Sequence, residues 1–369
     1  MANINDYLLW RGDINLSEKY PFNEVDSMIF ARFSYLPFDK IKLNKKETIS
    51  SIANKMQPLE VNNFLHEIDK ELIINMGKSD RFKNMLVTDF VKNNDKKIVK
   101  QFGAITIHIS AKELYVSYMG TDRSLNGWKE DFNMSFMSHV PCQISGKEYL
   151  ENISKKYKNK LLIVGGHSKG GNVAIYSSVT VSKKIQNKII KIYNFDGPGF
   201  HKDFIDKYGD NNLVKKIITY IPQNSIIGRM LGHREKVTIC LSNEKGFYQH
   251  YTESWEIFRD TIIKVDKNTK MSENINNMLI EWLDNTTEKD RKIFVDSIFE
   301  LLYSTDADTF KGIYKKLSTN IPKILSKYKK ISPEEKKNLS SMIKLFIVSY
   351  VKVIRNKKDS KKVKEKVNV

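Results

Sequence analysis

Hydrophobic positions along the chain change their spacing near Gly103 and again after about residue 255. Upstream of Gly103, apolar residues recur at helical spacing, as in Phe22–Tyr35 and Leu59–Met76, which predicts a helical segment. Between the two changes, short apolar runs alternate with helical periods. The runs predicted to be strands are Ala104–Ser110, Leu114–Met119, Leu161–Gly165, Ile189–Phe195, Ile217–Ile221 and Val237–Leu241. Apolar strands separated by helices are typical of a buried, mainly parallel sheet, so the fold class is α/β.

After about residue 255 the strand pattern ends and helical periods return at Asn274–Leu283, Lys289–Tyr303 and Thr309–Leu317. Ser332, followed by Pro333 and by Glu335 three residues on, is a further helix start. We therefore predict an α/β core at residues 101–262, with a helical N-terminal part at 1–100 packed on it and a helical C-terminal appendix at 263–355. Residues 356–369 are rich in lysine and are predicted to be disordered.

The composition excludes several classes of protein. The chain has 369 residues, with 62 Lys and Arg against 43 Asp and Glu, for a net charge of +19. We interpret this excess of positive charge as spread along the chain, and no nucleic-acid-binding motif accompanies it. No specific nucleic-acid binding is therefore expected. The basic C-terminal tail allows a peripheral contact with an anionic membrane.

The sequence lacks the common motifs for disulfide scaffolds, metal sites and nucleotide cofactors. Cys142 and Cys240 form no CxxC pair, which argues against a disulfide scaffold or a cysteine-rich zinc site. No dinucleotide-binding, P-loop or HExxH motif is present, so no cofactor or metal is expected. The N-terminus lacks the pattern of a signal peptide and no apolar run is long enough to span a bilayer, so the protein is expected to be cytoplasmic.

Chemistry is concentrated in the pentapeptide Gly166-His167-Ser168-Lys169-Gly170, a G-x-S-x-G pattern between a predicted strand and a predicted helix. In this context the serine occupies a sharp turn that holds its hydroxyl clear of the sheet, and the glycines let strand and helix pass close to it. The pattern predicts that Ser168 is a nucleophile.

The segment GHSKGGNVA resembles the elbow of the class 3 lipase group of α/β-hydrolases. Two further segments are similar to that group: Tyr118–Asp122, followed by Trp128 and Asp131, and Asn194–Gly199. The N-terminal sequence resembles a poorly characterised bacterial branch of it. The resemblance covers about residues 1–260 and implies an α/β-hydrolase fold and a serine esterase or lipase.

A serine hydrolase needs a histidine base, which follows the nucleophile and the acid in the chain order of this fold. His250 lies just after the last predicted strand, where the fold presents its histidine, whereas His233 precedes that strand and His201 comes too early. His250 is therefore the predicted base, with a surface or packing histidine as the alternative.

The acid departs from the class 3 pattern, because the loop Ile221–Gly228, where that group carries it, has no carboxylate. Asp196 follows a predicted strand in the correct chain order and is our choice for the acid. Two alternatives stay open. Asp196 could be a turn residue, and Asn224 or Ser225 could then orient His250 as a neutral acceptor.

The oxyanion hole is assigned to the backbone N–H groups of Thr121 and Lys169. Asp122 is expected to brace the first of these loops. The Met- and Phe-rich segment Asn126–Lys147 could cover the site or line an acyl pocket, although most of it is expected to pack in the core.

The sequence thus predicts a serine hydrolase that cleaves an ester through an acyl-enzyme on Ser168, with His250 as general base. The alternative is a non-catalytic α/β-hydrolase fold that binds a partner through its basic, helical C-terminal half.

Overall fold

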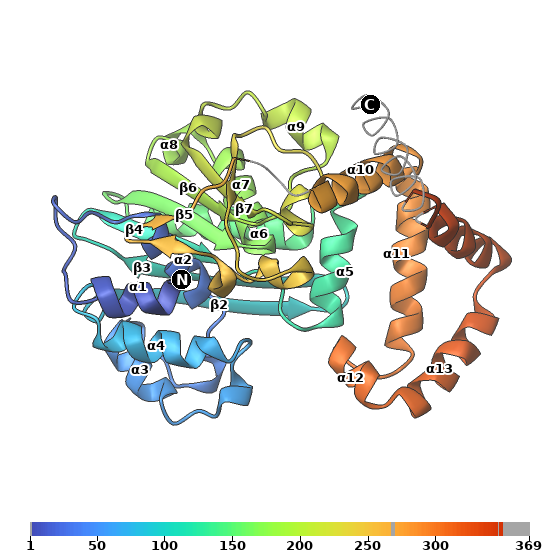
Figure 1. Ribbon diagram of the computed structural model, residues 1–369, viewed down its shortest axis with the longest axis horizontal. Helices are drawn as coiled ribbons and strands as arrows, with labels where there is room; N and C mark the ends of the chain where they lie inside the picture. Colours follow the sequence, from blue (N-terminus) through green and yellow to red (C-terminus); the bar gives the residue numbers. More distant parts are fainter. Residues whose placement is uncertain (1, 267–269, 346, 350–369) are drawn as a thin grey trace, which may run out of the picture.

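An eight-stranded mixed sheet forms the centre of the computed structural model, which describes residues 2–266, 270–345 and 347–349 (Figure 1). The strands are β1 (Lys46–Thr48), β2 (Leu86–Asp95), β3 (Lys100–His108), β4 (Glu113–Tyr118), β5 (Leu161–His167), β6 (Ile189–Phe195), β7 (Ile217–Pro222) and β8 (Val237–Cys240). They lie in the order of the sequence. Pairing is antiparallel from β1 to β4 and parallel from β4 to β8. The six predicted strands are confirmed as β3 to β8.

The periodicity predicted a helical N-terminal part, but the structure shows that this part also contains strands. It supplies β1 and β2, and β2 pairs with β3 along most of its length. The outer half of β2 is polar and largely exposed, so it lacks the apolar run by which a strand is recognised. The predicted helix at Leu59–Met76 is also shorter than expected, because α4 begins only at Ile68.

One face of the sheet is covered by the helices that connect its parallel strands. The helices on this side include α6 (Pro141–Lys156), α7 (Lys169–Thr180) and α9 (Lys202–Tyr208). Consecutive parallel strands are neighbours, and right-handed connections between such strands place their helices on the same face. Leu114 and Val116 of β4 accordingly pack in one buried cluster with Leu150 of α6 and Val173 of α7.

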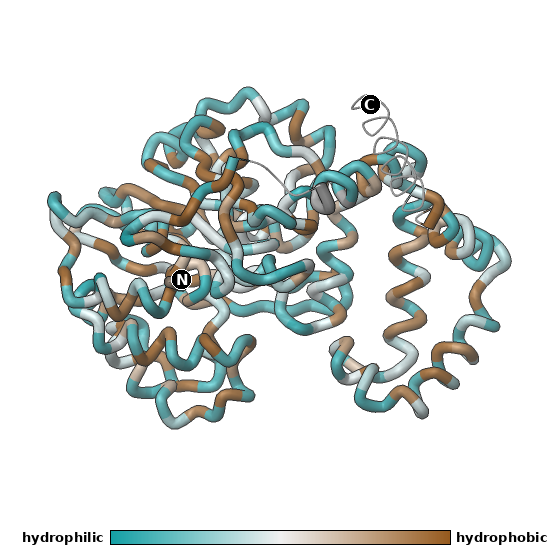
Figure 2. Tube along the Cα trace, in the orientation of Figure 1, coloured by the Kyte–Doolittle hydropathy of each residue, from teal (hydrophilic) through white to brown (hydrophobic). Residues whose placement is uncertain are grey.

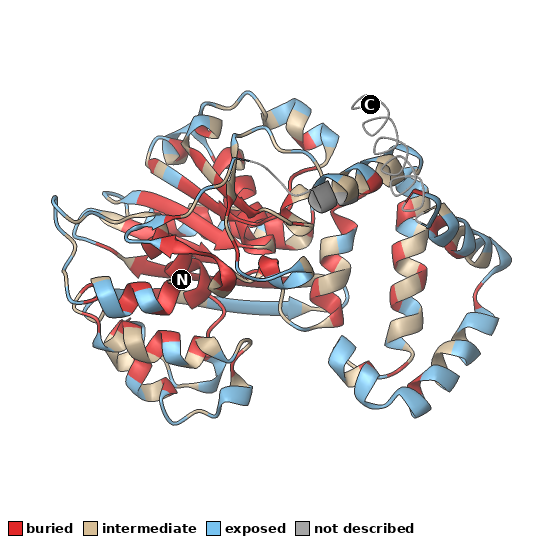
Figure 3. Ribbon diagram, in the orientation of Figure 1, coloured by how far each residue is buried: buried red, intermediate tan, exposed pale blue. Residues whose placement is uncertain are grey.

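The opposite face is covered by N-terminal helices, which are α1 (Ile4–Arg11), α2 (Glu24–Phe33), α3 (Ile49–Met56) and α4 (Ile68–Lys78). Side chains alternate along β4, so Tyr115 and Ser117 point toward this side. The Ser117 hydroxyl donates to the carbonyl of Phe30 at 2.7 Å, and the Tyr115 hydroxyl lies 2.8 Å from that of Ser27. Figure 3 shows α2 as buried as the sheet itself. The N-terminal segment therefore completes the core.

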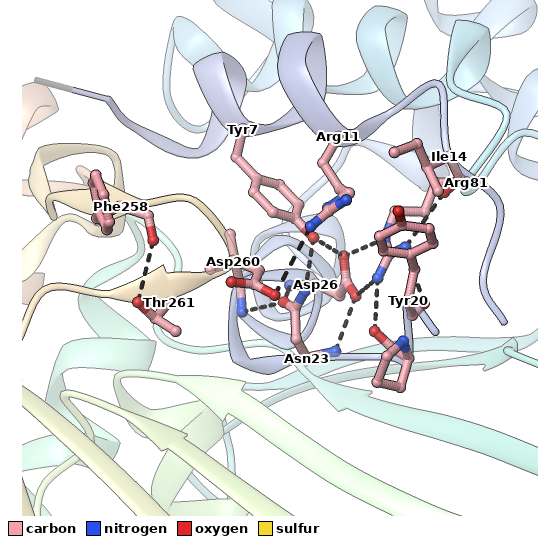
Figure 4. A network of polar contacts seen from close by, with 12 residues as sticks. Tyr7, Arg11, Ile14, Tyr20, Asn23, Asp26, Arg81, Phe258, Asp260 and Thr261 are labelled. Carbon is pink, nitrogen blue, oxygen red and sulfur yellow. Dashed lines mark hydrogen bonds and ion pairs between the residues drawn. The ribbon is translucent and has the colours of Figure 1, made fainter. Parts of the chain in front are cut away.

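A buried ionic network holds these N-terminal helices together (Figure 4). The guanidinium of Arg81, just after α4, contacts both carboxylate oxygens of Asp26 at 2.8 and 2.5 Å. Tyr7 of α1 donates to Asp26 at 2.8 Å and accepts from Asn23 at 2.8 Å. Asn23 also caps the N-terminus of α2. One carboxylate thus joins α1, α2 and the end of α4.

The C-terminal helices form an arm that extends away from the core (Figure 1). They are α10 (Lys270–Asp284), α11 (Glu288–Tyr303), α12 (Phe310–Lys315), α13 (Leu317–Lys330) and a last helix described at residues 333–345 and 347–349. The predicted helices are confirmed, and Ser332 caps the last one by accepting from the Glu335 N–H at 3.1 Å. The predicted disordered tail, 356–369, lies outside the described residues. Within the described part of the chain, every helix is too short or too polar to cross a bilayer.

The arm touches the core mainly through α5 (Leu125–Asn133). Phe132 of α5 packs on Phe299 of α11, with ring centroids 5.9 Å apart, and Trp128 packs on Phe310 at 6.1 Å. The same helix α5 faces the candidate site, so it joins the arm to that site.

Candidate active site

Ser168 occupies a strained turn between β5 and α7. Its backbone has φ 58° and ψ −134°, in the left-handed half of conformational space that a residue with a side chain rarely enters. The Ser168 N–H donates to the carbonyl of Phe195 and its carbonyl accepts from the Gly171 N–H, both at 2.9 Å. Strain of this kind costs on the order of 1–3 kcal/mol and persists only where the surrounding structure enforces it.

The two flanking glycines are required by the close approach of neighbouring backbone. A Cβ on Gly166 would lie 2.3 Å from the carbonyl carbon of Gly170, and one on Gly170 would lie 2.2 Å from the carbonyl oxygen of Tyr118. Both distances are far inside van der Waals contact. The pentapeptide therefore has the geometry expected of a nucleophile elbow.

Asp196 and His250 form a buried acid–base pair beside this turn. Asp196 directly follows β6 and has no exposed surface, and His250 ends the short 3-10 helix Gly246–His250. Nδ1 of His250 lies 2.6 Å from Oδ2 of Asp196. This contact leaves Nε2 of His250 as the ring nitrogen that can take a proton.

The loop after β7, which lacks a carboxylate, contributes hydrogen-bond donors instead. The Ser225 hydroxyl and the Gly228 N–H both donate to Oδ1 of Asp196, the second at 3.1 Å. The Asn224 N–H donates to the side chain of Gln249 at 2.9 Å. The partner that the structure brings to Nδ1 of His250 is thus Asp196. Sequence reasoning missed the roles of Ser225 and Gly228, since only the fold brings this loop to Asp196.

Ser168 and His250 line one cavity of about 270 Å³. Much of its wall is apolar and comes from distant segments of the chain. These wall residues are Leu65, Trp128, Phe132, Met134, Ile227, Met230, Leu231 and Phe247. The Met- and Phe-rich segment after residue 126 therefore does line the site through Trp128, Phe132 and Met134. His201 and His233 are absent from the described lining of this cavity, and each lies beside a carboxylate, Glu288 and Glu235 respectively.

Among the described residues there is no hydrogen bond between the Ser168 hydroxyl and His250. Catalytic hydrogen bonds are often long without substrate and tighten when it binds.

The expected oxyanion donors both border the cavity. Lys169 is the first residue of α7, so its N–H has no acceptor within the helix. Thr121 is held by its hydroxyl, which donates to Asp131 at 2.5 Å. Asp122 accepts from the Ser124 N–H at 2.8 Å, so it braces this loop as expected.

The side chain of Lys169 is buried in a cluster of carboxylates rather than presented to the cavity as a free charge. Its Nζ lies 3.0 Å from Glu130 and 3.7 Å from Asp131. Burial alone would lower the pKa of Lys169, but these carboxylates outweigh it and raise that pKa above its ordinary value. Glu130 also accepts from the N–H groups of Gln101 and Cys142, so one carboxylate joins α5, α6, α7 and β3 behind the elbow.

His167, inside the pentapeptide, was not assigned a role from the sequence. Its Nε2 lies 2.7 Å from the carbonyl oxygen of His250, and its Nδ1 lies 3.1 Å from the hydroxyl of Tyr35. Burial, followed by the neighbouring His250 and Arg32, lowers the pKa of His167 well below its ordinary value. The ring is therefore neutral, with Nε2–H donating to His250. Only the fold reveals this role, because Tyr35 is 132 residues away in sequence.

The parallel half-sheet, the strained Ser168 turn after β5 and the order Ser168, Asp196, His250 define the fold as an α/β-hydrolase fold with helical additions, as the resemblance implied. Residues 76–300 match the model of the Mbeg1-like family, and the chain belongs to that family. No curated protein sequence matches the chain significantly.

Two solved lipase structures are similar to this chain. One is a fungal lipase in complex with an inhibitor, with 10% sequence identity and a TM-score of 0.39 over 59% of this chain and 80% of that chain. The other is M37 lipase, with 14% identity and a TM-score of 0.33 over 56% of this chain and 69% of that chain.

Proposed function

We propose that the protein is a serine hydrolase that cleaves carboxylic esters. The observation that carries this proposal is the 2.6 Å contact between His250 Nδ1 and the buried carboxylate of Asp196, beside a cavity that Ser168 and His250 share. The strained conformation of Ser168 supports it, because such strain is concentrated at functional sites.

In the proposed reaction, Oγ of Ser168 attacks the ester carbonyl while Nε2 of His250 takes the hydroxyl proton. Asp196 stabilises the imidazolium that results and holds the ring in the required orientation. The N–H groups of Lys169 and Thr121 donate to the oxyanion. The C–O bond to the alcohol then breaks, and the leaving alcohol takes the proton from His250. Water, activated by His250, releases the acid and restores Ser168.

The cavity wall indicates the kind of ester. Its apolar side chains suit a substrate with a hydrocarbon acyl or alcohol group, and burial of such a group contributes about 0.8 kcal/mol per methylene. Activity is therefore expected on esters with apolar chains rather than on charged small acids.

A fluorophosphonate probe tests the proposal, because it reacts only with an activated serine. Wild type should be labelled, Ser168→Ala should not, and His250→Ala and Asp196→Asn should react far more slowly. The matched controls are Ser138→Ala and His139→Ala, two exposed residues outside the described cavity lining, which should react as wild type does.

Labelling that persists in Ser168→Ala would contradict the proposal, as would a folded wild type that does not react. In the second case the alternative of a non-catalytic binding module becomes the better account, since no Ser168–His250 hydrogen bond is present in the described residues.

A further inference from the structure

The positive charge of the protein is concentrated in the last 60 residues of the sequence, not spread along the chain as we had expected. Residues 310–369 contain 18 Lys and Arg and only 4 Asp and Glu, a net charge of +14 out of the total of +19. The first 309 residues are thus close to neutral for their length. A charge so placed favours a partner with negative charge.

The described helices of this region also expose apolar side chains. Along α13, Leu317, Ile321, Leu325 and Tyr328 follow one another at intervals of four, four and three residues, so they lie on one side of the helix. Leu325 is 55% exposed. Figure 2 shows hydrophobic segments along α13, and Figure 3 shows this helix as mostly exposed.

The last helix continues this apolar surface. Its exposed residues Ile343, Ile347 and Val348 line, with Tyr328 of α13, an open groove of about 570 Å³ whose inner side comes from α11. Large exposed apolar patches on a soluble domain mark interaction surfaces. We call the exposed apolar residues of α13 and the last helix the arm surface.

Lysines border the arm surface in two different ways. Lys323 and Lys327 form ion pairs with Asp306 and Glu300 at 2.6 and 2.5 Å, which fix α13 against the rest of the arm. Lys329 and Lys330, at the end of α13, are exposed and belong to none of the described ion pairs. Lys329, four residues after Leu325, lies at the end of the apolar side, so apolar and basic side chains face the same way. This combination is typical of a helix that lies in a membrane interface.

We propose that the arm surface binds the surface of an anionic phospholipid membrane. A second copy of the chain fits poorly, because two arms of this charge repel each other. Nucleic acid would satisfy the charge but not the exposed leucine, isoleucine and valine side chains, since backbone phosphates are bound by polar and basic groups. An anionic lipid surface can bind both kinds of side chain, because its headgroups attract the lysines and its acyl chains accommodate the apolar residues.

The proposal does not depend on catalysis. The arm surface is separate from the proposed active site, because its residues on α13 and the last helix are absent from the described lining of the cavity.

Co-sedimentation of the full chain with lipid vesicles tests the proposal. We expect binding to vesicles of phosphatidylcholine with phosphatidylserine, little binding to phosphatidylcholine alone, and weaker binding as salt is raised. The double variant Ile321→Ser with Leu325→Ser should lower binding, and so should Lys329→Glu with Lys330→Glu, each by about tenfold or more. Unchanged circular dichroism and thermal unfolding would show that these variants still fold.

The matched control is Lys183→Glu with Lys184→Glu, two adjacent exposed lysines on the core that make the same change in net charge. This variant should bind vesicles as wild type does. Equal loss in the control and arm variants would overturn the proposal, as would absence of binding to anionic vesicles at low salt. Dimerisation abolished by Ile321→Ser with Leu325→Ser would instead identify a second copy as the partner. Oligonucleotide binding that resists those serine substitutions and displaces the vesicles would identify nucleic acid.

Discussion

His167 holds the backbone of His250 in place: Nε2 of His167 lies 2.7 Å from the carbonyl oxygen of His250, and the two rings are 4.5 Å apart. Tyr35, just after α2, contacts the other ring nitrogen of His167 through its hydroxyl. The N-terminal segment thus reaches the proposed catalytic base through one intermediate side chain.

Replacing His167 by leucine should slow the reaction of Ser168 without unfolding the protein. The His250 carbonyl would lose its donor, and a buried unpaired acceptor costs about 1–3 kcal/mol, which corresponds to about a tenfold to hundredfold slower rate if the proposed base moves. His167→Gln keeps a hydrogen-bond donor and should therefore retain more activity than the leucine variant. Tyr35→Phe should also lose less activity than the leucine variant. Fluorophosphonate labelling rates measure these effects. A leucine variant that reacts as fast as wild type would show that this contact does not position the base.

Protein stability should fall as the pH drops below about 6.5, the ordinary pKa of histidine. Burial, followed by Arg32 and Arg123, lowers the pKa of His66 to about 3, and that of His167 is also well below its ordinary value. Below pH 6.5 these two histidines therefore bind protons in the unfolded chain but not in the folded one. The free energy of unfolding decreases as the pH falls.

His66→Gln should remove up to about 1.4 kcal/mol per pH unit of this dependence between about pH 6.5 and pH 3. Urea unfolding at several pH values measures it, with equal stability of variant and wild type near pH 7.5 as the control. An unchanged slope in the variant would show that His66 is readily protonated in the folded protein.

Asp196→Asn should lower the turnover of an ester by about 10⁴-fold, because the amide keeps the size of the carboxylate but favours the wrong tautomer of His250. Ser225→Ala removes one of the donors to Asp196 and should have a much smaller effect, about tenfold. Asp203→Asn, at an exposed carboxylate, is the control and should leave turnover unchanged. Near-normal turnover in Asp196→Asn would mean that the acid is a different residue.

Gly166→Ala should destabilise the elbow, since its Cβ would lie 2.3 Å from backbone that cannot move without displacing α7. We expect a loss of about 1–3 kcal/mol together with loss of probe labelling. Gly232→Ala is the matched control, because its nearest neighbour would be 3.5 Å away, an ordinary contact. Chemical unfolding of both variants measures the difference. Equal stabilities would mean that the turn can relax.

Removing one partner of the buried pair in Figure 4 should cost far more than removing one at the surface. Arg81→Met leaves the Asp26 carboxylate buried without its cation, which costs about 3–5 kcal/mol. Lys202→Met breaks the exposed pair with Asp206 and should leave the free energy of unfolding almost unchanged, because solvent screens such a pair. Similar losses in both variants would show that Asp26 is solvated by other means.

Several features were predictable from the sequence because they depend on residues close together in the chain. The strands β3 to β8 follow from runs of apolar residues, and the turn at Ser168 follows from two glycines that leave room for the backbone. Chain order and the ends of strands led to Asp196 and His250 as the predicted acid and base, because the carboxyl ends of parallel strands meet at one edge of a sheet. Their catalytic roles stay predictions.

Other features depend on contacts between residues far apart in the chain. The polar outer half of β2 carries no strand signal, and it becomes a strand only because β3 supplies a pairing partner. The donors to Asp196 from Ser225 and Gly228, and the contact of Tyr35 with His167, exist because helices and loops are packed against particular faces of the sheet.

The amino-acid sequence by itself therefore determined the class of fold and the elbow with its candidate nucleophile, through local periodicity and backbone sterics. Only the tertiary structure decided which groups surround Asp196 and His250, which face the N-terminal helices cover, and where the charged arm exposes its apolar side. These features depend on packing between segments that are far apart in the sequence. No local sequence pattern shows which of these segments will contact each other.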